Sequence, residues 1–79
     1  MNWTEIGRRA NALLDRLSNR LPEGTLSGLG LMSEGGEYGE LVIELTATLA
    51  KTRTVVTRQE LQELQALLEA TGMPTSAVG

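Results

Sequence analysis

The sequence contains no cysteine, no histidine and no phenylalanine, and only one tryptophan and one tyrosine among its 79 residues. Without cysteine, no disulfide can stabilise the chain as a small secreted scaffold. Without cysteine and histidine, it also lacks the usual protein ligands of zinc and copper, so we expect no metal site and no cofactor. The core must be built from leucine, valine, isoleucine, alanine and methionine, which favours packed helices over an aromatic-rich sheet.

Long apolar segments and the features of an N-terminal leader are missing as well. No window approaches the ~20 apolar residues that span a bilayer, and the first residues lack a basic segment followed by an apolar one. We therefore expect one cytoplasmic domain that does not bind a membrane. A chain of this length buries only ~60% of the surface of its unfolded form, so its core should be thin and leave no room for a deep pocket.

The first segment has the clearest helical pattern and predicts a helix over residues 2–21. Asn2 can cap this helix with Glu5 as the reciprocal partner, and Pro22 prevents its continuation past Leu21. The apolar residues recur at intervals of three and four, which places them on one face. These residues are Trp3, Ile6, Ala10, Leu13, Leu14, Leu17 and Leu21. The stripe fits the core of the domain, and the alternative is a seam for homodimerisation.

The glycine-rich stretch that follows is compatible with two structures. Leu26, Leu29 and Met32 have helical spacing, whereas Leu29 and Leu31 alternate with glycines as in a strand. In the strand alternative, Gly35 and Gly36 would form a turn that leads into a second strand. The pattern alone leaves both structures open.

A third helix is predicted over residues 37–51. The strand propensity of its β-branched residues competes with this prediction. The glutamates lie mostly on the side opposite to an apolar stripe of helical spacing. That stripe consists of Tyr38, Leu41, Val42, Leu45 and Leu49.

A last helix is predicted over residues 57–71. Thr57 and Glu60 form a capping box, in which each side chain accepts a hydrogen bond from a free backbone N–H. Gly72 is a natural left-handed cap at the other end, and residues 73–79 are expected to be frayed. The inward positions are Leu61, Leu64, Leu67 and Leu68. The four predicted helices give an all-α fold, a small four-helix bundle.

The acidic residues are concentrated in the middle of the chain. The net charge is −3, but residues 22–50 contain five glutamates and neither lysine nor arginine. Such a segment repels nucleic-acid phosphates and attracts basic protein surfaces, so we expect a protein partner and no nucleic acid. The predicted partner-binding residues are Glu34, Glu37, Tyr38, Glu40 and Glu44.

An ordinary explanation competes with this prediction. Glu37 and Glu40 would lie in the first turn of a helix, where negative charge is stabilising. Glu44 escapes that explanation, because Glu40 and Glu44 form a like-charge pair one turn apart, at a cost of ~0.2–0.5 kcal/mol. The pair is compatible both with a solvated helix face and with an electrostatic docking face. Tyr38 belongs to the apolar stripe, with a role as interface anchor as the alternative.

Catalysis is not expected from this sequence. The carboxylates lie on an exposed face where nothing would raise their pKa values, and their spacing is not that of a calcium loop. The glycines are not followed by the lysine and hydroxyl residue of a phosphate-binding loop. We therefore interpret the chain as a binding protein and not as an enzyme.

A set of residues in the second half of the chain carries a family resemblance. These residues are Gly36-Glu37-Tyr38-Gly39, Leu45, Leu49, Val56-Thr57, Leu64, Leu68 and Gly72-Met73. Together they resemble the MafI-type immunity proteins of bacterial polymorphic and contact-dependent toxin systems. The chain departs from the family pattern at Ile43, where members tend to have an acid, and at Val55, where they often have proline.

The resemblance implies an all-helical domain, with residues 25–34 forming a helix rather than a strand. It also implies a function, the stoichiometric binding and neutralisation of the toxic domain encoded by a neighbouring gene, often a nuclease. A basic cleft on such a toxin would suit the acidic surface. The alternative is a small helical adaptor that homodimerises through the apolar stripe of the first helix, whereas the immunity protein is expected to be a monomer when free.

Overall fold

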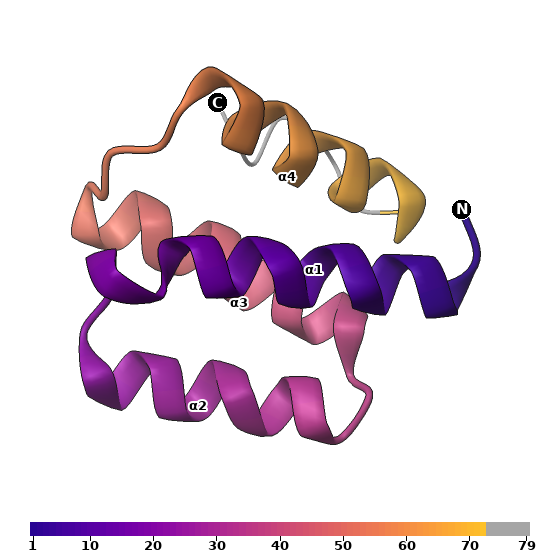
Figure 1. The fold of residues 1–79 in the computed structure, drawn as a ribbon, viewed down its shortest axis with the longest axis horizontal. Coiled ribbons are helices and arrows are strands. Elements are labelled where there is room, and N and C mark those ends of the chain that lie inside the picture. The colour runs from indigo at the N-terminus through magenta and orange to yellow at the C-terminus, as the bar shows by residue number, and fades with distance from the viewer. Residues whose placement is uncertain (73–79) are drawn as a thin grey trace.

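The computed structural model of the chain describes residues 1–72 and is all-α, with no strand in that range (Figure 1). It contains α1 (Trp3–Leu17), the short 3-10 helix η1 (Ser18–Arg20), α2 (Glu23–Glu34), α3 (Tyr38–Thr52) and α4 (Arg58–Ala70). The predicted fold class, a small four-helix bundle, is confirmed. The predicted frayed tail lies outside the described residues.

The centre of the bundle is formed by α1 and α3. Successive helices run in alternating directions, α4 packs against both central helices, and α2 packs mainly against α3 (Figure 1). The domain measures 29 × 27 × 17 Å, so it is flat and no side chain lies far from the surface.

A single apolar core joins the helices. Its buried members are Ile6, Ala10, Leu13, Leu14, Leu17, Leu21, Leu29, Leu41, Val42, Leu45, Leu49, Leu64, Leu67 and Leu68. The predicted stripe of the first helix is therefore buried within the chain, with one exception. Trp3 was predicted to point inward, but it is 58% exposed. It is the first residue of α1.

The first helix is shorter than predicted. Its α-helical part ends at Leu17, and a turn of 3-10 helix follows before Leu21, which is extended with φ −114° and ψ 149°. The residue before a proline avoids the helical region, so Pro22 ends the helix earlier than the apolar pattern indicates. The extended conformation still places the Leu21 side chain in the core.

The ambiguous glycine-rich stretch forms α2, which begins two residues before the predicted range. Leu29 is buried, Leu26 and Met32 pack against the core, and Leu31 is 69% exposed. In a strand, Leu29 and Leu31 would share one face, whereas in a helix they point in different directions. Their different burial is the signature of the helical alternative.

The last two helices begin and end within one residue of their predicted bounds. The capping box of α4 is present: the Glu60 N–H donates to Thr57 Oγ1 over 3.1 Å, and the Thr57 N–H donates to Glu60 Oε1 over 2.8 Å. Gly72 has φ +80°, as predicted for a left-handed cap. At the end of α3, the same role falls to a non-glycine residue, Arg53, with φ +52°.

Candidate binding surface

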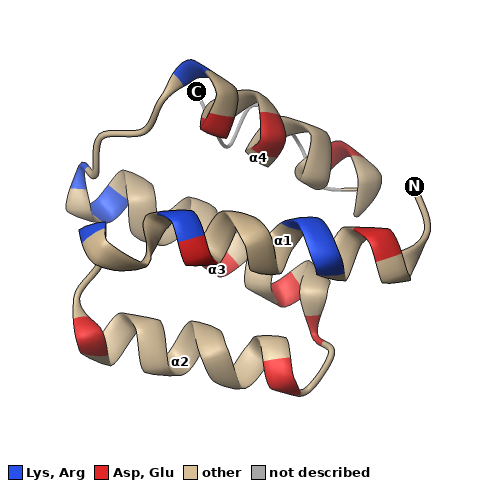
Figure 2. Cartoon of the chain, viewed as in Figure 1, with Lys and Arg blue, Asp and Glu red and all other residues tan. Residues whose placement is uncertain are grey.

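The residues predicted to bind a partner follow one another from the end of α2 into α3. Figure 2 shows acidic segments at the end of α2, in the following loop and in the first half of α3, whereas the basic segment of α3 lies at its far end. Glu34, Glu37, Glu40 and Glu44 are all exposed, and Tyr38 is half-buried against the core. We call these four glutamates the acidic surface.

Part of this surface borders a shallow groove of about 380 Å³ between the starts of α1 and α3. The groove is lined by Trp3, Gly36, Glu37, Tyr38, Gly39, Glu40 and Ile43. Three of the five predicted binding residues therefore meet at one place. Glu34 and Glu44 lie outside the groove.

The Tyr38 ring is seated on the backbone of α1. A Cβ atom added to Gly7 would lie 2.5 Å from Cε2 and Cζ of Tyr38, which is too close for any side chain. Gly7 is therefore the residue that allows the ring to approach, and this contact explains a glycine inside the first helix, where it costs stability. Trp3 makes a looser contact with Gly39, since its Cη2 atom lies 3.8 Å from the position of a Cβ there, an ordinary van der Waals distance.

Sequence reasoning missed two residues of this groove, Trp3 and Ile43. Trp3 was assigned to the core because it has the spacing of the apolar stripe. The available signal was its position directly after the capping residue Asn2, because a side chain at the very start of a helix can lie beyond the neighbouring helices. No sequence signal distinguished Ile43, which is half-buried beside the stripe of α3.

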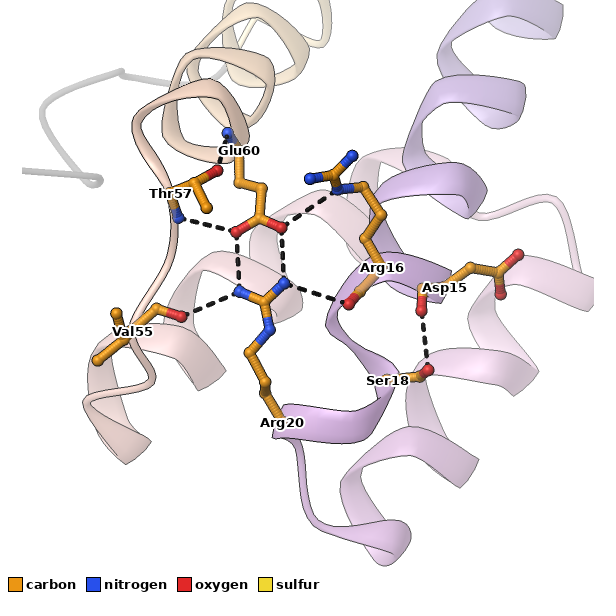
Figure 3. A network of polar contacts seen from close by, with 7 residues as sticks. All are labelled: Asp15, Arg16, Ser18, Arg20, Val55, Thr57 and Glu60. Carbon is orange, nitrogen blue, oxygen red and sulfur yellow. Dashed lines mark hydrogen bonds and ion pairs between the residues drawn. The ribbon is translucent and has the colours of Figure 1, made fainter.

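Arg16 of α1 and Arg20 of η1 contact Glu60 at the start of α4 (Figure 3). The Arg20 guanidinium donates to both carboxylate oxygens of Glu60, over 2.8 and 2.7 Å, and Arg16 Nε donates to Oε2 over 3.2 Å. Arg20 also donates to the carbonyl of Val55 over 3.1 Å. With the N–H of Thr57 as a further donor, every lone-pair direction of this carboxylate faces a partner.

The charge of Glu60 is tolerated because of these partners. Its side chain is only 2% exposed. The hydrogen bonds from the Arg20 guanidinium, and then that from the Thr57 backbone, hold the pKa of the Glu60 carboxyl far below its usual range, although burial acts in the opposite direction. Sequence reasoning identified Glu60 as part of a capping box, but missed its ion pairs.

A second ion pair joins the middle of α1 to the middle of α4. Arg9 Nε donates to Glu63 Oε2 over 2.8 Å, and Arg9 Nη2 donates to the other oxygen. This guanidinium lowers the pKa of the Glu63 carboxyl. Glu60 and Glu63 of α4 thus form ion pairs with Arg9, Arg16 and Arg20 in the first segment of the chain.

The acidic surface has no such partners. None of its four glutamates forms an ion pair within residues 1–72, where every salt bridge involves Glu5, Glu60 or Glu63. Arg9, Arg16 and Arg20 are paired with α4, and the four glutamates of the acidic surface are exposed.

No protein-family model, curated protein or solved structure matches the chain. The resemblance to MafI-type immunity proteins therefore remains a prediction from the residues. Among the described residues, no helix has the length and apolar character to cross a bilayer, and no three acidic side chains are grouped to hold a metal ion. The groove presents two carboxylates, one phenol and an apolar floor, an arrangement suited to binding a cationic or amphipathic group.

Proposed function

We propose that this protein is a non-catalytic inhibitor that binds a basic partner protein through its acidic surface and Tyr38. The observation that supports the proposal is the contrast between two sets of acids: Glu60 and Glu63 of α4 are paired with arginines, whereas Glu34, Glu37, Glu40 and Glu44 have no ion-pair partner in residues 1–72. An unpaired acidic surface attracts a basic partner before contact, and its negative charge complements the positive charge of that partner in the complex.

The resemblance supplies the kind of partner. We propose a bacterial toxin domain, of which a nuclease is the leading case, because the substrate cleft of a nuclease is basic. The protein would cover this cleft with one molecule per toxin, in the cytoplasm of the producing cell. It would act as an immunity protein without chemistry of its own.

The alternative, a homodimerising adaptor, depends on the apolar stripe of α1. That stripe is already buried inside the monomer, where Ile6, Leu13 and Leu17 are at most 3% exposed. A second chain could reach these side chains only if the core opened. We therefore favour the inhibitor, which uses a surface that is exposed in the part of the chain that the structure describes.

The test is a charge reversal on the acidic surface. The double variant Glu40→Lys and Glu44→Lys should bind the toxin domain encoded by the neighbouring gene more than ~10-fold more weakly, since breaking a desolvated charge pair costs ~2–5 kcal/mol. Its circular dichroism spectrum should be unchanged, because substitutions at exposed positions alter stability by less than ~0.5 kcal/mol. Calorimetry or surface plasmon resonance measures the affinity.

A matched control separates a local contact from the overall charge. The double variant Glu23→Lys and Glu69→Lys makes the same change in net charge at two exposed positions, the start of α2 and the end of α4. It should retain most of the affinity. Equal losses in both variants would show that only net charge matters, and a wild-type protein that does not bind the toxin domain would refute the proposed function.

A further inference from the structure

The groove between α1 and α3 has apolar walls that a partner can reach. Its most exposed wall is Trp3, the single tryptophan of the chain, with 58% of its surface accessible. Tyr38 and Ile43 are half-buried and line the same groove. Tryptophan and tyrosine beside a depression are the side chains that most often dominate the energy of a protein interface.

The rim of the groove is acidic. Glu37 and Glu40 line it together with Trp3 and have no ion pair in the part of the chain that the structure describes. A side chain that matches both the walls and the rim needs an apolar stem and a cationic end. This description limits the choice to lysine and arginine.

Arginine matches the groove better than lysine. Its flat guanidinium stacks on an indole or phenol face, and its fixed set of donors can bond a carboxylate at the same time. Lysine has a compact and strongly hydrated charge that would have to lose more water to approach the rings.

One aromatic wall of the groove is held in place before any partner binds. The Tyr38 ring packs on α1 at Gly7 and is fixed by the packing of the two central helices, whereas Trp3 makes an ordinary contact with Gly39 and stays 58% exposed. A wall that is already fixed needs little ordering when a side chain enters the groove, which lowers the entropic cost of binding.

From these observations we propose that the groove formed by Trp3, Glu37, Tyr38, Glu40 and Ile43 receives an arginine side chain of the basic partner. The inference builds on the proposed function and deepens it, since it assigns one anchoring contact within the larger acidic surface. The indole of Trp3 stacks on the guanidinium, and Glu37 and Glu40 accept its hydrogen bonds.

The groove can be tested without the partner, because Trp3 is the sole tryptophan and its fluorescence reports on this site alone. The probe is a short acetylated and amidated peptide with one arginine between glycines, titrated at low salt so that screening is weak. The control peptide carries citrulline, which has nearly the same shape and no charge. The arginine peptide should give a saturable change, with the citrulline peptide binding at least ~10-fold more weakly and the lysine peptide in between.

Protein variants locate the contact. Glu37→Gln and Glu40→Gln should each weaken the arginine peptide several-fold, and Glu69→Gln, at an exposed position of α4 outside the acidic surface, should leave it unchanged. Trp3→Leu keeps an apolar side chain but removes the stacking face, so the amide shifts of Gly39 and Ile43 on peptide addition should be largely lost in NMR spectra. Equal binding of the arginine and citrulline peptides, or shifts that survive in Trp3→Leu, would overturn the inference.

The complete partner distinguishes this inference from the proposed function. If the toxin domain binds and Trp3→Leu lowers its affinity at least ~10-fold, the groove is an anchor of the interface. If the toxin domain binds Trp3→Leu as tightly as the wild type, the inference is wrong and the proposed function stands. If the toxin domain does not bind at all, the proposed function is wrong, and the peptide titration still decides whether the groove accepts arginine.

Discussion

Glu60 and Arg20 are joined by two hydrogen bonds although 40 positions separate them in the sequence. The contact connects the end of the first helical segment to the start of α4, and the same carboxylate caps α4 through the N–H of Thr57. The Glu60 side chain therefore both caps the start of α4 and holds α4 against the first helical segment.

Replacing this carboxylate should cost more stability than replacing any exposed one. Glu60→Ala removes the hydrogen bonds from Arg20 and Thr57, and a hydrogen bond to a charged group is typically worth ~1.5–3 kcal/mol. We expect a loss of at least that size in the free energy of unfolding, measured by urea denaturation. Glu69→Ala, an exposed position on the same helix, should change it by less than ~0.5 kcal/mol. Equal effects would show that the Glu60 contacts are not stabilising.

Low pH should lower the stability of the fold through the carboxyl groups of Glu60 and Glu63. Because the folded-state pKa values of Glu60 and Glu63 are lowered, their contribution is fully present above the ordinary glutamate pKa of ~4.3 and is lost as the pH falls below it toward the folded-state values. The urea midpoint should therefore fall on acidification below about pH 4.3. In Glu60→Gln the decrease should be shallower, and in Glu69→Gln as steep as in the wild type. Identical slopes in all three proteins would assign acid sensitivity to other carboxyl groups.

A charge inside the apolar core should unfold the domain. Leu13 is 3% exposed, so Leu13→Asp places a carboxylate in the apolar core, and the nearest cations, Arg9 and Arg16, are already paired with Glu63 and Glu60. The loss should consume most of a stability of ~4–12 kcal/mol. Ala12→Asp, at the exposed neighbouring position, should remain folded. Sedimentation should show a monomeric wild type, and a dimer that Leu13→Asp converts into a folded monomer would instead establish the adaptor alternative.

The end of α3 offers a substitution that should increase stability. Arg53 has φ +52°, a left-handed conformation that costs a residue with a side chain ~1–2 kcal/mol and costs glycine almost nothing. Allowing for the extra freedom of glycine in the unfolded chain, Arg53→Gly should raise the free energy of unfolding by ~0.5–1 kcal/mol. Lys51→Gly, two residues earlier in regular helix, should lower it by a similar amount. A loss in both variants would mean that the Arg53 side chain makes a contribution larger than its strain.

The sequence predicted those parts of the fold that depend on neighbouring residues. The stripe of α1, the Thr57–Glu60 capping box and the left-handed Gly72 are all local patterns, and all three are present. For α2 the pattern was not sufficient, because glycines dilute its apolar spacing, and only packing against α3 separates the buried Leu29 from the exposed Leu31.

The remaining features depend on how distant segments meet. The ion pair between Arg20 and Glu60 exists because α1 and α4 pack side by side, and no spacing within either segment encodes it. The groove likewise requires the start of α3 to lie on Gly7. Trp3 has the spacing of a core residue, but in the fold it is 58% exposed and lines the groove.

The packing of α2 has a consequence for the order in which the domain opens. This helix contributes one buried residue, Leu29, and no ion pair links it to another helix among residues 1–72, although Ser33 bonds to Asn11. Local opening is easiest where few apolar contacts must be broken. The amide protons of α2 should therefore exchange with deuterium before those of α1, α3 and α4, through detachment of this helix while the other three stay assembled.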